Sequence, residues 1–435
     1  MSAASIRRHL PILALAILAG LAARLLWIAF IHPDPLDGRF DDTVWYRSAA
    51  RFIADGEGYV NPFTGAPTAW WPPGYPFFLG GVFAALGEGV AQTIASNVVL
   101  QLLTIPLVYA IAALLFERRT AAVAAFAMAA WPGQVYFASL TLSEPLFTFL
   151  FVLAFLLMLL VPRSGRWQPL TIASFGIAVA AATLTRGQAL VLLPVALLTW
   201  RLCGVQWGRS AGWTALATVA VALCMTPWVL RNQEQLGSPV IISTNMGGNL
   251  WLGHHEGATG RMTANEPEPP IPAKGSLAWT EWEVAGDRMG RNAAIDYAFE
   301  HPRDELRLAI VKVRALYEAD STAIDWNTGF VDAGPIGSET IEQALRDLAN
   351  GFWFAMLLLA AVGLVASRAA LRGRAAALPI LVLIWTAAHV AFFGDPRFHY
   401  PIVFVFAVLG ARGAVVLFEA LRRPQPKLDS RYAAA

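Results

Sequence analysis

Residues 10–31 read LPILALAILAGLAARLLWIAFI, an apolar run long enough to cross the roughly 30 Å hydrocarbon core of a bilayer as one helix. Arg7 and Arg8 precede the run. It is longer than the core of a signal peptide, and no small-residue cleavage pattern follows it. We therefore expect a retained first transmembrane helix whose start lies on the cytoplasmic side.

The whole sequence has the composition of a membrane protein. Hydrophobic residues make up 57% and charged residues 14% of the chain, against roughly 45–50% and 25% in soluble domains. A net charge of +2 without a basic cluster argues against a nucleic-acid surface. Cys203 and Cys224 lie in apolar segments, where they are typical of small buried hydrophobic residues rather than of a disulfide framework.

Apolar segments and basic turns predict ten membrane crossings with both termini in the cytoplasm. Every short inner connection is basic, as the positive-inside rule requires, and abundant Ala, Gly and Arg with little Lys favours a bacterial plasma (inner) membrane. The predicted spans are 10–31, 90–116, 120–139, 144–162, 168–185, 187–203, 211–230, 351–367, 376–393 and 399–421. The inner basic residues are Arg118, Arg119, Arg163, Arg166, Arg201, Arg209, Arg368, Arg372, Arg374, Arg422, Arg423 and Lys427.

Three regions follow from this topology: an N-terminal transmembrane module, a large external loop, and a C-terminal transmembrane module with a short cytoplasmic tail. They cover residues 1–230, 231–350 and 351–435, and the first contains an external loop (33–75) and a segment too short to span, read as re-entrant or interfacial (76–89).

The large external loop contains a Pro-rich stretch and two helical patterns. Residues 266–272 cannot form regular helix or a central strand. Residues 277–300 and 304–318 have helical patterns. The latter carries Leu306, Ile310, Val313 and Tyr317 on one apolar stripe and is expected to lie along the membrane surface. No convincing internal repeat is found, which weakens the interpretation of the chain as an inverted-repeat transporter.

Acidic residues at outer helix ends are the first candidates for chemistry. Asp41 and Asp42 begin a probable helix after the first span, where they either cap it or supply a general base. Glu144 starts another span after Ser143, where it either caps its helix or binds an acceptor hydroxyl or a metal.

Three arginines also stand at outer helix ends: Arg186, Arg231 and Arg397. A planar guanidinium at that depth suits a phosphate at the level of the lipid headgroups. The alternative is ion pairing with acids of the outer loops. Sequence alone leaves both open for each arginine.

Aromatic and polar residues of the outer loops supply the candidates for substrate binding. Residues 70–76 form a rigid aromatic turn, which is either an interfacial aromatic belt or a stacking wall for a sugar or prenyl chain. Residues 244–257 are rich in Gly, which permits close backbone approach to a ligand; its two adjacent histidines lack the usual zinc spacing. Together with Glu144, the candidates are Tyr46, Tyr75, Asn249, Trp251, His254, His255 and Tyr400.

The order of these motifs resembles the GT-C glycosyltransferases, specifically the bacterial relatives of protein O-mannosyltransferases (glycosyltransferase family 39) and of the lipid A aminoarabinose transferase. The motifs are Asp-Asp-x-x-x-Tyr-x-x-x-Ala to Gly-x-Gly-Tyr (41–59), Pro-Pro-Gly-Tyr-Pro (72–76), Ser-Glu-Pro-Leu (143–146), Leu-Thr-Arg (184–186), Pro-Trp-x-x-Arg-Asn (227–232), Gly-Gly-Asn-Leu-Trp-x-Gly (247–253) and Pro-Arg-Phe-x-Tyr-Pro (396–401).

The resemblance implies an all-α polytopic GT-C-type transmembrane helix bundle, with two long external loops carrying short interfacial helices. It further implies an enzyme that uses a polyprenyl-phosphate sugar, with a first-loop aspartate as base and outer arginines near the lipid phosphate. The family's Tyr four residues after the Asp favours Asp42 as the base, with Asp41 then orienting it or binding acceptor. Some relatives bind a divalent metal; no ligand set matches here, and no other cofactor is expected.

These observations together predict inverting transfer of a sugar to a hydroxyl of a lipid, glycan or protein acceptor outside the cytoplasm. A sugar phosphate already has a stable leaving group, so the enzyme needs a base for the acceptor and cations for the departing phosphate. The alternatives are a flippase or exporter of lipid-linked sugars, in which no residue acts as a base, and an envelope-assembly scaffold without catalysis.

Overall fold

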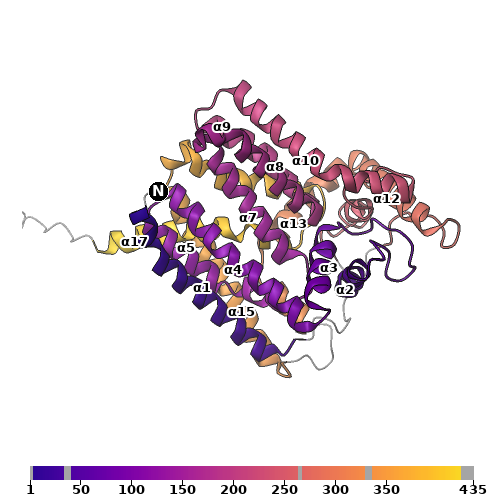
Figure 1. Cartoon of the computed structure of the whole chain (residues 1–435), viewed down its shortest axis with the longest axis horizontal. Coiled ribbons are helices and arrows are strands. Elements are labelled where there is room, and N and C mark those ends of the chain that lie inside the picture. The colour runs from indigo at the N-terminus through magenta and orange to yellow at the C-terminus, as the bar shows by residue number, and fades with distance from the viewer. Residues whose placement is uncertain (1–2, 34–40, 263–266, 329–335, 423–435) are drawn as a thin grey trace, which may run out of the picture.

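The computed structural model describes residues 3–33, 41–262, 267–328 and 336–422, and these residues form an all-helical molecule without a named strand. The long apolar helices pack alongside one another, and helices α2, α3 and α12 lie together at one end of this bundle (Figure 1). The predicted all-α fold is confirmed. The tail after Arg422, predicted to be cytoplasmic, lies outside the described residues.

By length and composition, seven helical segments of the described residues could cross a membrane, or eight if a bent pair counts as one span. The seven are His9–Ile31 in α1 (Ala3–Ile31), α4 (Val90–Leu115), Glu144–Arg163 with α7 (Glu144–Leu160), Gly165–Thr185 with α8 (Gln168–Thr185), α10 (Trp207–Leu236), α15 (Glu339–Ala366) and Pro396–Leu421 with η7 (Pro396–Ile402) and α17 (Val403–Leu421).

Three of the ten predicted spans differ in the structure from a single full-length helix. Span 120–139 breaks at Pro132, which has no N–H to donate, into α5 (Arg118–Ala130) and α6 (Pro132–Tyr136) with a 45° bend. Spans 187–203 and 376–393 are shorter apolar helices, Gly187–Leu202 and Arg374–Val390. These two start with 3₁₀ turns before α9 (Leu192–Leu202) and α16 (Ala377–Val390), and the larger 3₁₀ rise brings each to roughly 26 Å.

Small residues set the closest approach in the bundle, between α15 and α17. A Cβ placed on Gly363 would lie 1.9 Å from the Leu409 carbonyl oxygen, and one on Gly413 would lie 2.0 Å from that of Leu359. Only glycine fits at either position. The same small-residue packing is typical of helix pairs in membranes, where close backbone contact replaces the missing hydrophobic driving force.

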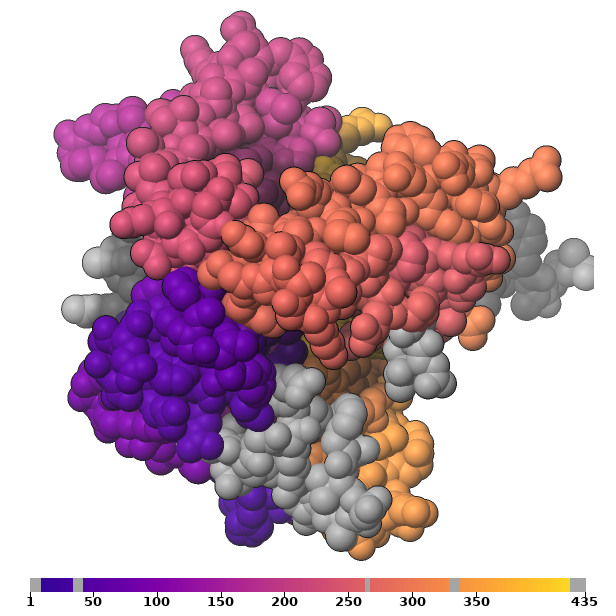
Figure 2. Space-filling view, turned by 90° about the vertical axis from the view of Figure 1, so that its right-hand side faces the viewer, coloured from indigo at the N-terminus to yellow at the C-terminus, as the bar shows by residue number. Residues whose placement is uncertain are grey.

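The predicted external segments form one end of the molecule. The first contains α2 (Asp41–Ala54) and leads into α3 (Gly74–Leu86), the apolar segment expected to be re-entrant; the second contains α11 (Met246–Trp251), α12 (Trp279–Glu300), α13 (Pro302–Tyr317) and α14 (Thr322–Thr328). Figure 2 shows this end, with the first segment in indigo beside the second in red to orange. Helices α10 and α15 extend into residues 231–350, so that division of the chain stays a prediction.

Both predicted helices of the second external segment are present as α12 and α13, and residues 267–272 have no regular structure. The apolar stripe predicted for α13 faces outward: Leu306 and Ile310 are 72% and 70% exposed. The buried face carries Leu308, Lys312 and Leu316 instead. An exposed apolar stripe is what a helix on a membrane surface requires, so that part of the expectation stays open.

Candidate active site

The segment η7 joins α16 to α17. It carries the motif Pro-Arg-Phe-x-Tyr-Pro (396–401), the last of the motifs on which the resemblance depends. Asp395 precedes it and accepts a hydrogen bond from the Arg397 backbone N–H at 2.7 Å, while Pro396 occupies the first turn, where a missing N–H costs nothing. A 3₁₀ helix has three residues per turn. Arg397 and Tyr400 therefore share one face of η7, and His399 lies on another.

Arg397 brings together two acids from distant parts of the chain. Its Nη1 lies 3.7 Å from Asp42 Oδ2 in α2, and its Nε lies 3.5 Å from Glu144 Oε1 at the start of α7. Arg186, at the end of α8, donates to the same Glu144 oxygen at 2.7 Å. We call these four residues, Asp42, Glu144, Arg186 and Arg397, the charge cluster. Asp42 is the predicted base, Arg186 and Arg397 are predicted phosphate ligands, and Glu144 is a predicted substrate-binding residue.

Glu144 is the buried centre of the charge cluster. The residue is 1% exposed, and its Oε2 has no hydrogen-bond partner among the described residues. Arg397 Nε likewise lacks a well-aligned acceptor. By contrast the Asp42 side chain is 20% exposed. Glu144 is therefore placed to hold two guanidinium groups, and Asp42 is the carboxylate that a ligand can reach from outside. The side chain of Asp41 lies outside the described residues.

Two buried tyrosines lie beside the charge cluster. Tyr46 of α2 and Tyr75 of α3 meet edge to face with ring centroids 5.0 Å apart, and the Tyr75 hydroxyl has no hydrogen-bond partner among the described residues. Burial, and then the negative charge of Asp42, raise the pKa of Tyr46 above its usual value. Tyr46 therefore stays a neutral phenol whose position near Asp42 agrees with the four-residue spacing seen in the sequence.

Arg231 is held in a different place from Arg186 and Arg397. It donates from Nη1 to the Thr68 carbonyl oxygen at 2.7 Å and from Nη2 to the Tyr59 carbonyl oxygen at 2.5 Å. Nearby, the buried Glu283 of α12 accepts from Thr68 Oγ1 at 2.7 Å and from Ala69 N–H at 2.8 Å. We call Arg231, Glu283 and these three partners the loop clamp, because it ties the first external segment to α10 and α12. A phosphate-binding role for Arg231 stays a prediction.

The Gly-rich loop packs on α12 and α13. A Cβ on Gly247 would lie 1.9 Å from the Asp287 carbonyl oxygen, so glycine is required for this contact. Trp251 stacks on His255 at 5.2 Å and donates to the Pro267 carbonyl oxygen at 3.0 Å. Asn249 lies within α11. Roles for these residues in substrate binding remain predictions.

His254 belongs to a buried group with charged partners. Its Nδ1 lies 2.9 Å from Glu305 Oε1, and its Nε2 lies 3.2 Å from Lys312 Nζ. Lys312 also donates to the Val390 carbonyl oxygen at 3.2 Å. Burial lowers the pKa of Lys312 to about 8, although Glu305 acts in the opposite direction. This contact pattern fastens the loop to α13 and to the end of α16.

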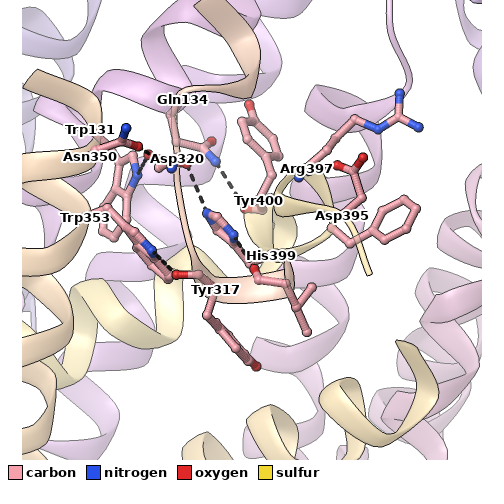
Figure 3. A network of polar contacts seen from close by, with 12 residues as sticks. Trp131, Gln134, Tyr317, Asp320, Asn350, Trp353, Asp395, Arg397, His399 and Tyr400 are labelled. Atoms are coloured by element: carbon pink, nitrogen blue, oxygen red, sulfur yellow. Dashed lines mark hydrogen bonds and ion pairs between the residues drawn. The ribbon is translucent and has the colours of Figure 1, made fainter. Parts of the chain in front are cut away.

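A second buried network, around His399 and Asp320, was not foreseen from the sequence (Figure 3). His399 Nδ1 lies 2.8 Å from the Leu316 carbonyl oxygen, and Nε2 lies 3.1 Å from Asp320 Oδ1. Both partners are oxygen atoms, so the His399 ring bridges the backbone at Leu316 and the carboxyl group of Asp320. Trp131 Nε1 donates to the other Asp320 oxygen at 2.8 Å, and Trp353 stacks on the His399 ring at 4.2 Å.

This network fixes η7 from the side opposite the charge cluster. Arg397 points away from it in Figure 3, while Tyr400 is buried with its hydroxyl accepting from Gln101 at 3.2 Å. Tyr400 is therefore a packed residue of η7 in this structure. The only sign of this network in the sequence is His399 itself, which lies in the motif 396–401 beside the candidate phosphate ligand Arg397.

Metal binding has no ligand set to assign. Over residues 3–33, 41–262, 267–328 and 336–422, no group of three or more His, Cys, Asp or Glu side chains is arranged to hold an ion. The acids of the charge cluster face arginines instead, and an arginine competes with a cation for the same carboxylate oxygens.

Known proteins similar to this chain fall into one kind of membrane enzyme. The family model described as dolichyl-phosphate-mannose-protein mannosyltransferase matches residues 71–230. This range contains Tyr75, Glu144 and Arg186, whereas Asp42 and Arg397 lie outside it. No curated protein sequence shows a significant match.

Among solved structures, the oligosaccharyltransferase of Archaeoglobus fulgidus in the apo form matches with a TM-score of 0.58 at 16% identity, over 95% of this chain and 51% of that one. The same organism's AglB, in complex with an inhibitory peptide and a dolichol-phosphate, matches with a TM-score of 0.58 at 20% identity, over 97% and 51%. The chain has the GT-C fold. It spans about half of the length of these oligosaccharyltransferases.

A further match is ArnT from Cupriavidus metallidurans bound to undecaprenyl phosphate, with a TM-score of 0.45 at 16% identity, over 95% of this chain and 78% of that one. The two oligosaccharyltransferase matches, each with a TM-score of 0.58, confirm at the level of the fold the resemblance to GT-C enzymes drawn from the motifs, and the family model supports it over residues 71–230. A multi-pass membrane protein agrees with the apolar helices.

Proposed function

We propose that this chain is a membrane glycosyltransferase that moves a sugar from a polyprenyl-phosphate donor to a hydroxyl of a lipid, glycan or protein acceptor outside the cytoplasm. The observation that carries the proposal is the charge cluster, in which the accessible carboxylate of Asp42 lies against Arg397, and the buried carboxylate of Glu144 holds both Arg397 and Arg186. The GT-C fold and the mannosyltransferase family model support it. The proposed setting is a bacterial plasma membrane, with both termini cytoplasmic.

Asp42 is the proposed general base. The acceptor oxygen attacks the anomeric carbon, the bond from that carbon to the phosphate oxygen breaks, and polyprenyl phosphate leaves with the electron pair. The acceptor's proton passes to Asp42. A single displacement of this kind inverts the anomeric configuration. A positioned carboxylate is enough, because the phosphate is a good leaving group and most of the remaining barrier concerns alignment.

Arg397 and Arg186 are the proposed partners of the leaving phosphate. Each guanidinium has five N–H groups, and contacts with Glu144 and Asp42 occupy only some of them. Glu144 holds both guanidinium planes in place before the donor arrives, which lowers the cost of ordering them during reaction. Glu144 is thus a positioning residue in this scheme.

The purified protein, given polyprenyl-phosphate sugar with a labelled sugar and an envelope extract, tests the proposal. A transferase releases polyprenyl phosphate and labels a product, and the Asp42→Asn variant does neither at a comparable rate. The anomeric proton coupling of the product reports inversion. A flippase or exporter moves the intact donor across proteoliposomes without releasing polyprenyl phosphate, and that result would contradict the proposal.

A further inference from the structure

A cavity of about 500 Å³ opens at the end of the bundle opposite the charge cluster. Helices α4 and α15 both begin beside the predicted external segments, so their last residues lie at the other end, where Figure 1 also shows the N-terminus. The lining comes from the ends of α4 and α15, from the segments that follow them, and from Arg412 of α17. Its volume is within the roughly 300–1,000 Å³ range of small-molecule sites.

Apolar residues make up most of the cavity lining, and its charged residues are Glu117 and Arg412. Arg412 Nη1 donates to Glu117 Oε1 at 2.8 Å, and the guanidinium lies over the Phe116 ring, 5.9 Å from its centroid. A guanidinium has five N–H groups, and Arg412 has no other acceptor among the described residues. Its side chain is 24% exposed. Arg412 can therefore donate to a ligand in the cavity without losing its contact with Glu117.

Positive charge predominates around the cavity. The segments that follow α4 and α15 carry exposed arginines, which are Arg118, Arg119, Arg368 and Arg372. Negative charge comes from Glu117, from Glu419, which pairs with Arg119 at 3.2 Å, and from the carboxyl ends of α4 and α15. Each helix end amounts to only about half a charge, so the arginines, with Arg412 included, still outweigh the acids. The cavity therefore favours an anion.

We propose that this cavity binds the phosphate of an anionic phospholipid in the leaflet at this end of the bundle, which is cytoplasmic by the predicted topology. Basic pockets between membrane helices on that side are typical sites for lipid headgroups. Arg412 donates to the phosphate with its planar fork, and apolar lining residues such as Leu114 and Leu115 contact the first carbons of the lipid chains. A water-soluble phosphate makes no use of those walls. The lipid joins α4, α15 and α17, a role independent of the proposed sugar transfer.

Melting temperatures of the intact, delipidated protein in a non-ionic detergent test this proposal, because a ligand that binds the folded state raises them with its concentration. The probe is phosphatidylglycerol. Diacylglycerol with the same chains lacks the phosphate, and glycerol phosphate lacks the chains, so both should give little rise. Arg412→Gln should weaken phosphatidylglycerol binding about tenfold. Arg166→Gln is the matched control: it removes an exposed arginine from another inner turn, outside the cavity lining, and should leave the affinity unchanged.

Two further variants test the proposal even if Arg412→Gln does not fold. Glu117→Gln removes the competing carboxylate, so affinity for phosphatidylglycerol should rise, whereas affinity for a cationic ligand would fall. Ala370→Trp keeps every charge but fills the cavity, so binding should be lost. Equal losses for Arg412→Gln and Arg166→Gln, an equal rise with diacylglycerol, or an equal rise with glycerol phosphate would each overturn the proposal.

Discussion

The charge cluster and the loop clamp each hold an arginine from the end of a helical segment, and they satisfy it in different ways. In the loop clamp, Arg231 donates to two carbonyl oxygens, and Glu283 accepts from a hydroxyl and an N–H. In the charge cluster, Arg397 faces two carboxylates, and polar atoms of Glu144 and Arg397 stay without aligned partners. The carbonyl partners of the loop clamp fix Arg231 in place, whereas the buried polar atoms without partners in the charge cluster can still form hydrogen bonds with a ligand.

Replacement of Asp42 by Asn should give the largest effect. Asp42 lies in the first turn of α2, and Asn has nearly the same size and shape as Asp, so folding is retained, but the amide cannot accept the acceptor's proton. Turnover should fall by about 10²–10⁴-fold, measured as release of polyprenyl phosphate. Asp55→Asn, an exposed acid just beyond the end of α2, is the control and should keep its rate. Near-normal turnover of Asp42→Asn would show that Asp42 is not the base and leave it only as an ion-pair partner of Arg397.

Removal of the Glu144 charge should have the next largest effect. Glu144→Gln leaves Arg186 and Arg397 without their shared buried counter-ion, which costs about 3 kcal/mol in comparable pairs. The melting temperature in detergent should fall clearly. Glu117→Gln breaks an exposed pair with Arg412 and should cost under about 1 kcal/mol. Equal shifts for the two variants would mean that the charge cluster is no more coupled than a surface pair.

The two arginines can then be compared directly. Arg397→Lys keeps the charge but loses the planar fork, and donor affinity should fall about tenfold. For Arg231→Lys the structure predicts a change of under about twofold, because its fork holds Tyr59 and Thr68 carbonyl oxygens. Its effect should instead be faster amide exchange in residues 59–69. Equal losses of donor affinity would indicate that Arg231 also binds the donor phosphate, a role that the sequence leaves open for it.

Local patterns foretold most of the helices. Apolar length and helical period give α12 and α13 within two residues of their predicted bounds, since both signals are properties of neighbouring residues. Partners do not follow from such patterns. His399 and Asp320 are 79 positions apart, and the residues around neither one predict a contact with the other. For the same reason the sequence treated Arg231 and Arg397 alike: an outer-end arginine is visible, but whether it meets a carbonyl or a carboxylate depends on tertiary packing.

The smallest expected effect is a dependence of the loop clamp on pH. Burial raises the pKa of Glu283 above its usual value, although the hydrogen bonds from Thr68 and Ala69 act in the opposite direction. The folded state therefore takes up a proton at a higher pH than the unfolded chain does. Stability from this group rises as pH falls through the raised pKa toward the unfolded value of 4.5, and it declines as pH rises through the same window.

Melting temperatures of the detergent-solubilised protein between pH 7 and pH 5, compared among variants, isolate this group from other carboxyls. Glu283→Gln cannot titrate, so its curve should lack the rise toward low pH that the unaltered protein shows. Glu281→Gln, an exposed neighbour on α12, should keep that rise. If Glu283→Gln and the unaltered protein follow the same curve, then Glu283 takes up no proton on folding over this range. The loop clamp would then not respond to pH over this range, and the contrast between the two regions would rest on their hydrogen-bond and ion-pair partners alone.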